Sequence, residues 1–259
     1  MKTCAAVLIL SLLASAAGAA DEGAPDEPVV SPPVTVVGRS FARVKAAPMR
    51  VELTISVETR GLVVGEGRDV FEHDRDSYRV VSEARTTGLA RIFKRVEEKR
   101  ESRGLVSGTG IQPQMFRQER KGKASKTATF DWDLQKLHLQ EGDDQETVDL
   151  PPFTLDQTSL TYAFVFLEPP RSGTFQVHVT DGRRLTAYAV AFVAKERLKT
   201  PLGELETLHF RKVQHDDDKR GFEFWLSTAH HHLPVRVRIV EKDGTAFDSN
   251  VTKLQFDGR

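Results

Sequence analysis

Residues 51–58 read Val-Glu-Leu-Thr-Ile-Ser-Val-Glu, and this alternation of apolar and polar side chains decides the fold class. Successive side chains of a β-strand point to opposite faces, so the four apolar residues share one face and the four polar residues share the other. The stretch therefore predicts a strand with one face on a core and one face in solvent.

Similar short apolar runs, separated by turns, return along the chain as far as residue 256. The clearest hairpin joins residues 174–179 to residues 184–193 across Thr180-Asp181-Gly182-Arg183, because Asp-Gly is favoured in tight β-turns. About ten strands with mostly tight connections predict antiparallel pairing. The expected fold is mainly β, a strongly curved antiparallel sheet or an incomplete β-barrel.

One central α-helix is predicted to lie against the concave side of this sheet. Thr154 and Gln157 have the spacing of a capping box, apolar residues recur at helical spacing over residues 160–167, and Pro169-Pro170 ends the run. Aromatic residues make the opposite side of this helix apolar as well, so we expect it to be covered on both sides.

The first residues have the layout of a secretory signal peptide. A short positively charged start precedes an apolar run, and small residues follow from Ala14 to Ala20. The run is shorter than the roughly 20 apolar residues of a membrane-spanning helix, so no transmembrane anchor is expected. We predict a cleaved signal peptide at residues 1–20, a flexible acidic, proline-rich leader at residues 21–45, a single β-rich domain at residues 46–259, and a periplasmic location.

Composition excludes several classes of function. The chain has 37 basic and 37 acidic residues, so it has no net charge with which to attract nucleic acid. Its single cysteine, Cys4, lies in the predicted signal peptide, which rules out cysteine nucleophiles, thiolate metal sites and thiol redox chemistry in the exported chain. Phosphate-binding and dinucleotide-binding motifs are absent from the sequence. No cofactor is expected, and an enzyme is the less favoured interpretation.

Two histidine-containing stretches are candidates for a metal site. They are His230-His231-His232 and His215-Asp216-Asp217-Asp218. Consecutive residues of an extended chain point to opposite faces, so adjacent histidines do not all converge on one ion. We interpret both stretches as exposed turns and predict no metal site.

The order of several short motifs resembles a known family. The motifs are Gly61-Leu62-Val63-Val64-Gly65-Glu66, Ser77-Tyr78-Arg79, Gly88-Leu89-Ala90, Ala128-Thr129-Phe130-Asp131-Trp132, Pro151-Pro152, Asp156, Asp181-Gly182-Arg183, Thr200-Pro201-Leu202-Gly203 and Trp225-Leu226-Ser227. Together they resemble the bacterial domain-of-unknown-function 3108 family from about Arg50 to Phe256. The histidines at 230–232 depart from the mixed acidic and basic turn expected there. The resemblance implies an exported, β-rich protein of the proteobacterial envelope, and it brings no active site with it.

The stretch Arg184–Ala194 is apolar on both faces. Its alanines form a shallow row on one face, and larger side chains occupy the other. Either the predicted helix packs into this row, or the helix and the curved sheet enclose an apolar pocket. In the second interpretation the ligand-binding residues are Ala187, Ala189, Ala191, Tyr162, Phe164, Phe166 and Phe224.

Three functions follow from these patterns. The first hypothesis is a non-enzymatic periplasmic protein that binds a lipophilic ligand or acyl chain on the concave side of the sheet. The second is a protein-protein interaction module in cell-envelope assembly, which a filled core and an exposed apolar patch would favour. The third is a hydrolase of unknown substrate, which needs a nucleophile and a base in one cleft. A lipid or other apolar small molecule and an envelope protein are therefore the expected partners.

Overall fold

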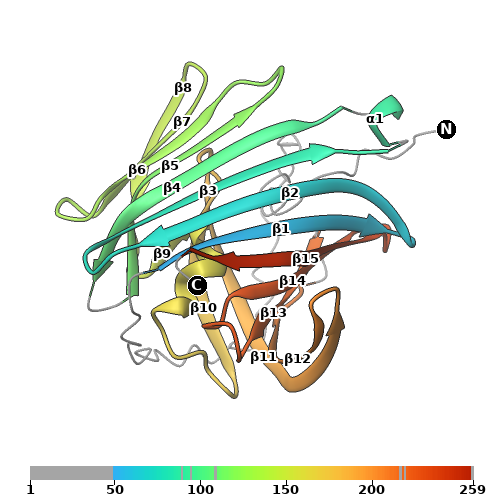
Figure 1. The fold of residues 1–259 in the computed structure, drawn as a ribbon. Coiled ribbons are helices and arrows are strands. Elements are labelled where there is room, and N and C mark those ends of the chain that lie inside the picture. Colours follow the sequence, from blue (N-terminus) through green and yellow to red (C-terminus); the bar gives the residue numbers. More distant parts are fainter. Residues whose placement is uncertain are drawn as a thin grey trace.

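A computed structural model describes residues 49–257, apart from residues 89, 94, 108, 109, 216, 217 and 219. The predicted signal peptide and leader lie outside the described residues. The strands within this range pair into one fifteen-stranded sheet (Figure 1). They are β1 (Met49–Thr59), β2 (Leu62–His73), β3 (Ser77–Thr86), β4 (Glu97–Ser107), β5 (Gly110–Arg120), β6 (Lys126–Asp131), β7 (Lys136–Glu141), β8 (Asp144–Asp149), β9 (Thr154–Asp156), β10 (Thr174–Thr180), β11 (Leu185–Thr200), β12 (Gly203–Lys212), β13 (Arg220–Ser227), β14 (Pro234–Glu241) and β15 (Ala246–Phe256).

The order of the strands forces the sheet to curl. Strands β1 to β8 extend it one way and β15 back to β9 the other way, so β8 and β9 lie at opposite edges. In a flat sheet with strands about 4.8 Å apart, these edges would be separated by about 67 Å. Only residues 150–153 join β8 to β9, however, and a link of this length spans at most about 18 Å. The sheet therefore winds back on itself, and β9 contacts β5.

The mainly β, curved and open architecture is thus confirmed, and the expected number of about ten strands was too low. Neighbouring strands are antiparallel except β9 and β10, which are parallel. The alternation at residues 51–58 is also confirmed, because Val51, Leu53, Ile55 and Val57 point to the inside of the curl and are buried. We call this side of the sheet the inner face and the opposite side the outer face.

The inside of the curl is occupied by a short helix, η2 (Ser159–Val165), which is a 3-10 helix with every residue buried. The prediction of a central α-helix beginning at Thr154 was wrong. Residues 154–156 pair with β10 as strand β9, and the Thr154 hydroxyl donates to the Pro151 carbonyl at 2.7 Å instead of capping a helix. A further helix among the described residues is α1 (Ala90–Phe93). Within the described residues, neither helix has the length or apolarity to cross a membrane.

Asp156 fixes η2 at its amino-terminal end. Its buried carboxylate accepts hydrogen bonds from the backbone N–H groups of Thr158 (2.8 Å) and Ser159 (2.9 Å). It also accepts from the hydroxyls of Ser159 (2.9 Å) and of Ser102 (2.5 Å), which lies on the inner face of β4. Burial raises the pKa of the Asp156 carboxyl, although the hydrogen bonds from Ser102 and Ser159 act in the opposite direction. This residue therefore ties the internal helix to the wall of the sheet.

Further polar groups are buried on the inner face beside η2. The Tyr162 hydroxyl donates to Asp69 on β2 at 2.7 Å. Glu98 and Arg100 on β4 form a buried ion pair. Residues 97–103 of β4 are almost all charged. Every second one of them points inward, so one face of this stretch is buried, and its charged residues Glu98 and Arg100 pair with each other.

Candidate functional site

The seven predicted ligand-binding residues do not lie together. Tyr162, Phe164, Phe166 and Phe224 are in the interior and are at most 3% exposed. The Tyr162 ring stacks on Phe71 at 4.7 Å, and the Phe164 ring stacks on Phe210 at 5.7 Å and on Phe224 at 6.3 Å. These aromatic side chains pack on one another as core residues.

The three alanines lie on the outer face of β11. Ala187 is exposed, and Ala189 and Ala191 are half-buried, whereas Tyr188 and Val190 between them are buried on the inner face. The expectation that the alanines face the helix on the concave side was therefore wrong. The physical reason is the period of the strand. Turning the alanines inward would have exposed the larger side chains to water, which is less favourable.

The alanine row continues into a cluster of polar and aromatic side chains on the outer face. Ala191 pairs with Arg211 of β12, and Ala194 pairs with His209. A β-bulge between these pairs presents Val193, which is 42% exposed. We call the side chains of Ala187, Ala189, Ala191 and Val193 the apolar strip.

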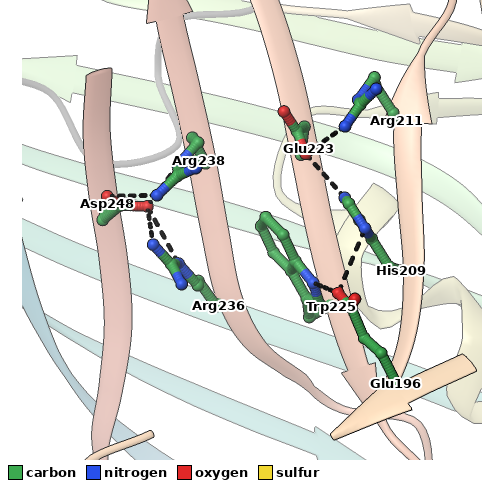
Figure 2. Close-up of polar contacts among 8 residues, drawn as sticks. All are labelled: Glu196, His209, Arg211, Glu223, Trp225, Arg236, Arg238 and Asp248. Atoms are coloured by element: carbon green, nitrogen blue, oxygen red, sulfur yellow. Dashed lines mark hydrogen bonds and ion pairs between the residues drawn. The ribbon is translucent and has the colours of Figure 1, made fainter. Parts of the chain in front are cut away.

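Two carboxylates hold His209 at the centre of the cluster (Figure 2). Its Nε2 lies 2.7 Å from Glu223 on β13, and its Nδ1 lies 3.3 Å from Glu196 on β11. The imidazole stacks on the Trp225 indole at a centroid distance of 4.2 Å, and the indole N–H donates to Glu196 at 2.6 Å. The His209 and Trp225 rings are almost fully buried, so they form the rigid base of the cluster and are not available for contact with a partner.

Two arginines of β14 lie on the side of the Trp225 ring away from β12. The Arg236 guanidinium lies 5.1 Å from the Trp225 ring centroid, in cation–π geometry. Arg236 and Arg238 of β14 both donate to Asp248 of β15, at 2.7 Å and 2.8 Å (Figure 2). Burial alone would raise the pKa of the Asp248 carboxyl, but the hydrogen bonds from Arg238 and Arg236 outweigh it and hold the pKa below its usual value.

The arrangement is suited to recognition. Each charged group is held in place by a partner of opposite charge, so little conformational freedom is lost when a second molecule docks. The accessible parts are the apolar strip, the guanidinium of Arg211, whose side chain is 54% exposed, and the carboxylate of Glu196, whose side chain is 41% exposed. An apolar surface next to oriented charges is the usual composition of a protein interface.

Glu223 is expected to matter more for stability than an exposed glutamate in a similar pair. Replacing Glu223 by glutamine weakens the hydrogen bonds to His209 and Arg211, and we expect a loss of about 1–2 kcal/mol in the free energy of unfolding. The control is Glu204→Gln, since Glu204 is exposed and lies 3.7 Å from Arg197. This change should stay within about 0.5 kcal/mol. Urea denaturation measures both, and equal losses would contradict a fixed cluster.

The histidine turn was interpreted as exposed, and the structure describes it as a tight turn between β13 and β14. His231 and His232 both have positive φ, and the Leu233 N–H donates to the His230 carbonyl at 2.9 Å. Within the described residues, no group of three or more histidine, cysteine, aspartate or glutamate side chains is placed to hold a metal ion. Asp216 and Asp217 lie outside the described residues.

Sequence reasoning did not assemble the cluster, although a signal for it was present. His209 and Arg211 alternate along β12, and Glu223 and Trp225 alternate along β13. Each of these two strands thus carries polar or amphipathic residues at every second position, and these residues lie on the outer face. The sequence does not give the register of β12 against β13, so it does not show that His209 faces Trp225 and that Arg211 faces Glu223.

The fold and this surface define an open, β-barrel-like protein with a packed interior. The chain belongs to the family described as Protein of unknown function (DUF3108), whose profile matches residues 51–250.

One solved structure supports this fold, and a second was compared with it. A β-barrel-like protein of domain of unknown function DUF1849 from Brucella abortus superimposes with a TM-score of 0.51 at 13% identity, covering 83% of this chain and 100% of that chain. A putative exported protein with a YmcC-like fold from Bacteroides fragilis matches with a TM-score of 0.34 at 13% identity, covering 84% and 100%. No curated protein matches the chain.

Proposed function

We propose that this protein is a non-enzymatic, exported protein of the cell envelope that recognises another protein through the outer face of β11–β13. The observation that carries the proposal is the placement of the apolar strip. It lies on the outer face beside the Arg211 guanidinium and the fixed cluster around His209, while the aromatic side chains expected to line an internal pocket pack on one another. A periplasmic location rests on the predicted signal peptide.

The two other hypotheses have less support. A carrier of a lipophilic ligand on the concave side was expected to leave the four aromatic residues as the walls of a pocket, and each of them is instead packed in the core. For a hydrolase, the linked hydroxyl and carboxyl groups of Tyr78, Ser102 and Asp156 are buried away from a substrate in solution. Surface recognition needs neither an open cavity nor an accessible nucleophile.

Photo-crosslinking in intact cells tests the proposal. A benzophenone amino acid is placed at Ala189 in the apolar strip, and at Thr147, an exposed residue of the edge strand β8, as the control. We expect a discrete protein adduct from position 189 and none from position 147. Adding Ala191→Glu should remove the adduct without lowering the melting temperature, because the side chain at this position faces outward and lies opposite Arg211. Absence of an adduct from positions 187, 189 and 191 would contradict the proposal.

Native mass spectrometry of the gently purified protein tests the lipophilic alternative in parallel. A packed interior is expected to retain no acyl-chain molecule. Stoichiometric recovery of a neutral acyl-chain molecule, together with no adduct at position 189, would support the carrier hypothesis instead.

A further inference from the structure

The outer face of β2–β5 carries charges that alternate in sign from strand to strand. Along one row, Arg68 of β2 pairs in register with Glu83 of β3, which pairs with Lys99 of β4. The Lys99 ammonium lies 3.4 Å from Glu83, and Arg68 also forms an ion pair with Glu52 of β1. The neighbouring row runs through Glu66, Arg85, Glu97 and Lys121 with the opposite signs. Opposite charges in facing positions stabilise a sheet.

One position breaks this alternation. Arg79 of β3 pairs in register with Arg103 of β4, the one like-charged pair among the paired positions of the described β2–β5 residues. Arg79 is bridged to Glu101 at 2.7 Å and to Glu72 at 3.6 Å. Arg103 has no hydrogen bond or ion pair within the described residues, and its side chain is exposed. Facing like charges destabilise a sheet unless a third group compensates them.

Both arginines line a groove of about 1090 Å³ that crosses the ends of these strands. The acidic residues of the groove are already engaged. Glu72 and Asp257 pair with Arg50, and Asp74 accepts hydrogen bonds from the backbone of the β2–β3 turn. The three arginines and three acidic residues of the groove balance formally, and Arg103 is the charged side chain among them that has no ion pair or hydrogen bond within the described residues.

The same groove has apolar walls. Met49, Leu105 and Met115 line it together with Arg103, and Leu105 is 42% exposed. Met115 is the residue paired with Arg103 across β4 and β5, so an apolar side chain lies directly beside the unpaired guanidinium. Flexible methionine side chains adapt readily to an apolar ligand.

We propose that this groove binds an anionic amphiphile, with its phosphate or carboxylate head on Arg79 and Arg103 and its apolar part over Met115 and Leu105. Two guanidinium groups provide several N–H donors for an oxyanion, and they are held next to each other by the strand register. Binding places an anion beside the Arg103 guanidinium, which has no ion pair within the described residues, while Arg79 keeps its bridges to Glu101 and Glu72. The site is separate from the surface of β11–β13 and does not depend on it.

Titration calorimetry with dodecyl phosphate below its micellar concentration tests the site. We expect saturable binding of one molecule by the wild-type protein, weakened by added salt. Arg103→Gln should reduce the affinity about tenfold or more, as expected for the loss of a charge-assisted pair. The matched control is Arg117→Gln, since Arg117 is an exposed arginine of β5 on the same face and is bridged to Glu119. It should leave the affinity within about twofold.

Arg103→Glu separates a binding effect from a folding effect. A glutamate at this position faces Arg79 and restores the alternation of signs, so the melting temperature should be unchanged or rise by up to about 4 °C while binding is lost. If the Arg103→Glu variant keeps its melting temperature, its loss of binding cannot be explained by unfolding. Inorganic phosphate and the neutral dodecyl maltoside are expected to bind at least tenfold more weakly than dodecyl phosphate. Equal binding by wild type and Arg103→Gln overturns the proposal, as does equally tight binding of inorganic phosphate or of the neutral detergent.

Discussion

Phe164→Ala is expected to lower the free energy of unfolding by about 3–5 kcal/mol, because it removes a buried ring and leaves a cavity that a packed core closes only in part. The side chain is 1% exposed. Its ring stacks on Phe210 at an interplanar angle of 10° and meets Phe175 edge to face at 6.0 Å. Urea denaturation monitored by far-ultraviolet circular dichroism measures the loss.

The same experiment distinguishes a packed helix from the wall of a ligand pocket. Leu134→Ala is the control, since Leu134 is 69% exposed in the β6–β7 turn and its change should stay within about 0.5 kcal/mol. If Phe164 instead lined an open pocket, its ring would already have an empty side. The truncation would then cost little stability and would enlarge the space for an apolar probe. A loss below about 1 kcal/mol would therefore contradict the packed interior.

The β class and the antiparallel order could be predicted because they depend on local signals. The alternation at residues 51–58 and the Asp-Gly turn at residues 181–182 each lie within a few residues of the hydrogen bonds that they specify. The curling of the sheet is different. It follows from the four-residue link at 150–153 between the two edge strands, and its meaning appears only when the strand order is known.

The helix shows how a local signal can be outweighed. The spacing of Thr154 and Gln157 is that of a capping box, but residues 154–156 gain strand hydrogen bonds with β10. The cap is supplied instead by Asp156, which accepts the N–H groups of the two residues that open the turn. Pairing with β10 therefore outweighed the local helix signal.

The outer-face sites required information that no single strand contains. The cluster around His209 joins side chains of five strands, β11 to β15. The unpaired Arg103 is unusual only because Arg79 faces it across β3 and β4. The family motifs point to part of this structure. Tyr78 and Asp156 both occur in them, and the structure links the two through the Ser102 hydroxyl, at 3.0 Å and 2.5 Å.

Asp156→Ala is the second change with a large expected effect. It leaves two backbone N–H groups and two hydroxyls in the interior without their common acceptor, and each unsatisfied buried donor costs about 1–3 kcal/mol. Partial rearrangement of the hydroxyls limits the total, so we expect a loss of about 3–5 kcal/mol. Asp156→Asn is the matched control. The amide oxygen still accepts from the backbone, and the amide N–H₂ donates to the hydroxyls of Ser102 and Ser159.

The pH dependence of this pair of variants tests the charge of the buried carboxyl. Burial raises the pKa of Asp156 above its value of about 3.9 in an unfolded chain. The contribution of such a group to stability is complete below the unfolded-state pKa and is lost as the pH rises through the higher folded-state pKa. We therefore expect the free energy of unfolding of the wild type, relative to Asp156→Asn, to be greater at pH 4 than at pH 7.5. Urea denaturation of both proteins at the two pH values measures the difference. A relative gain by the wild type at the higher pH would mean that four donated hydrogen bonds outweigh burial and keep the carboxylate ionised inside the sheet.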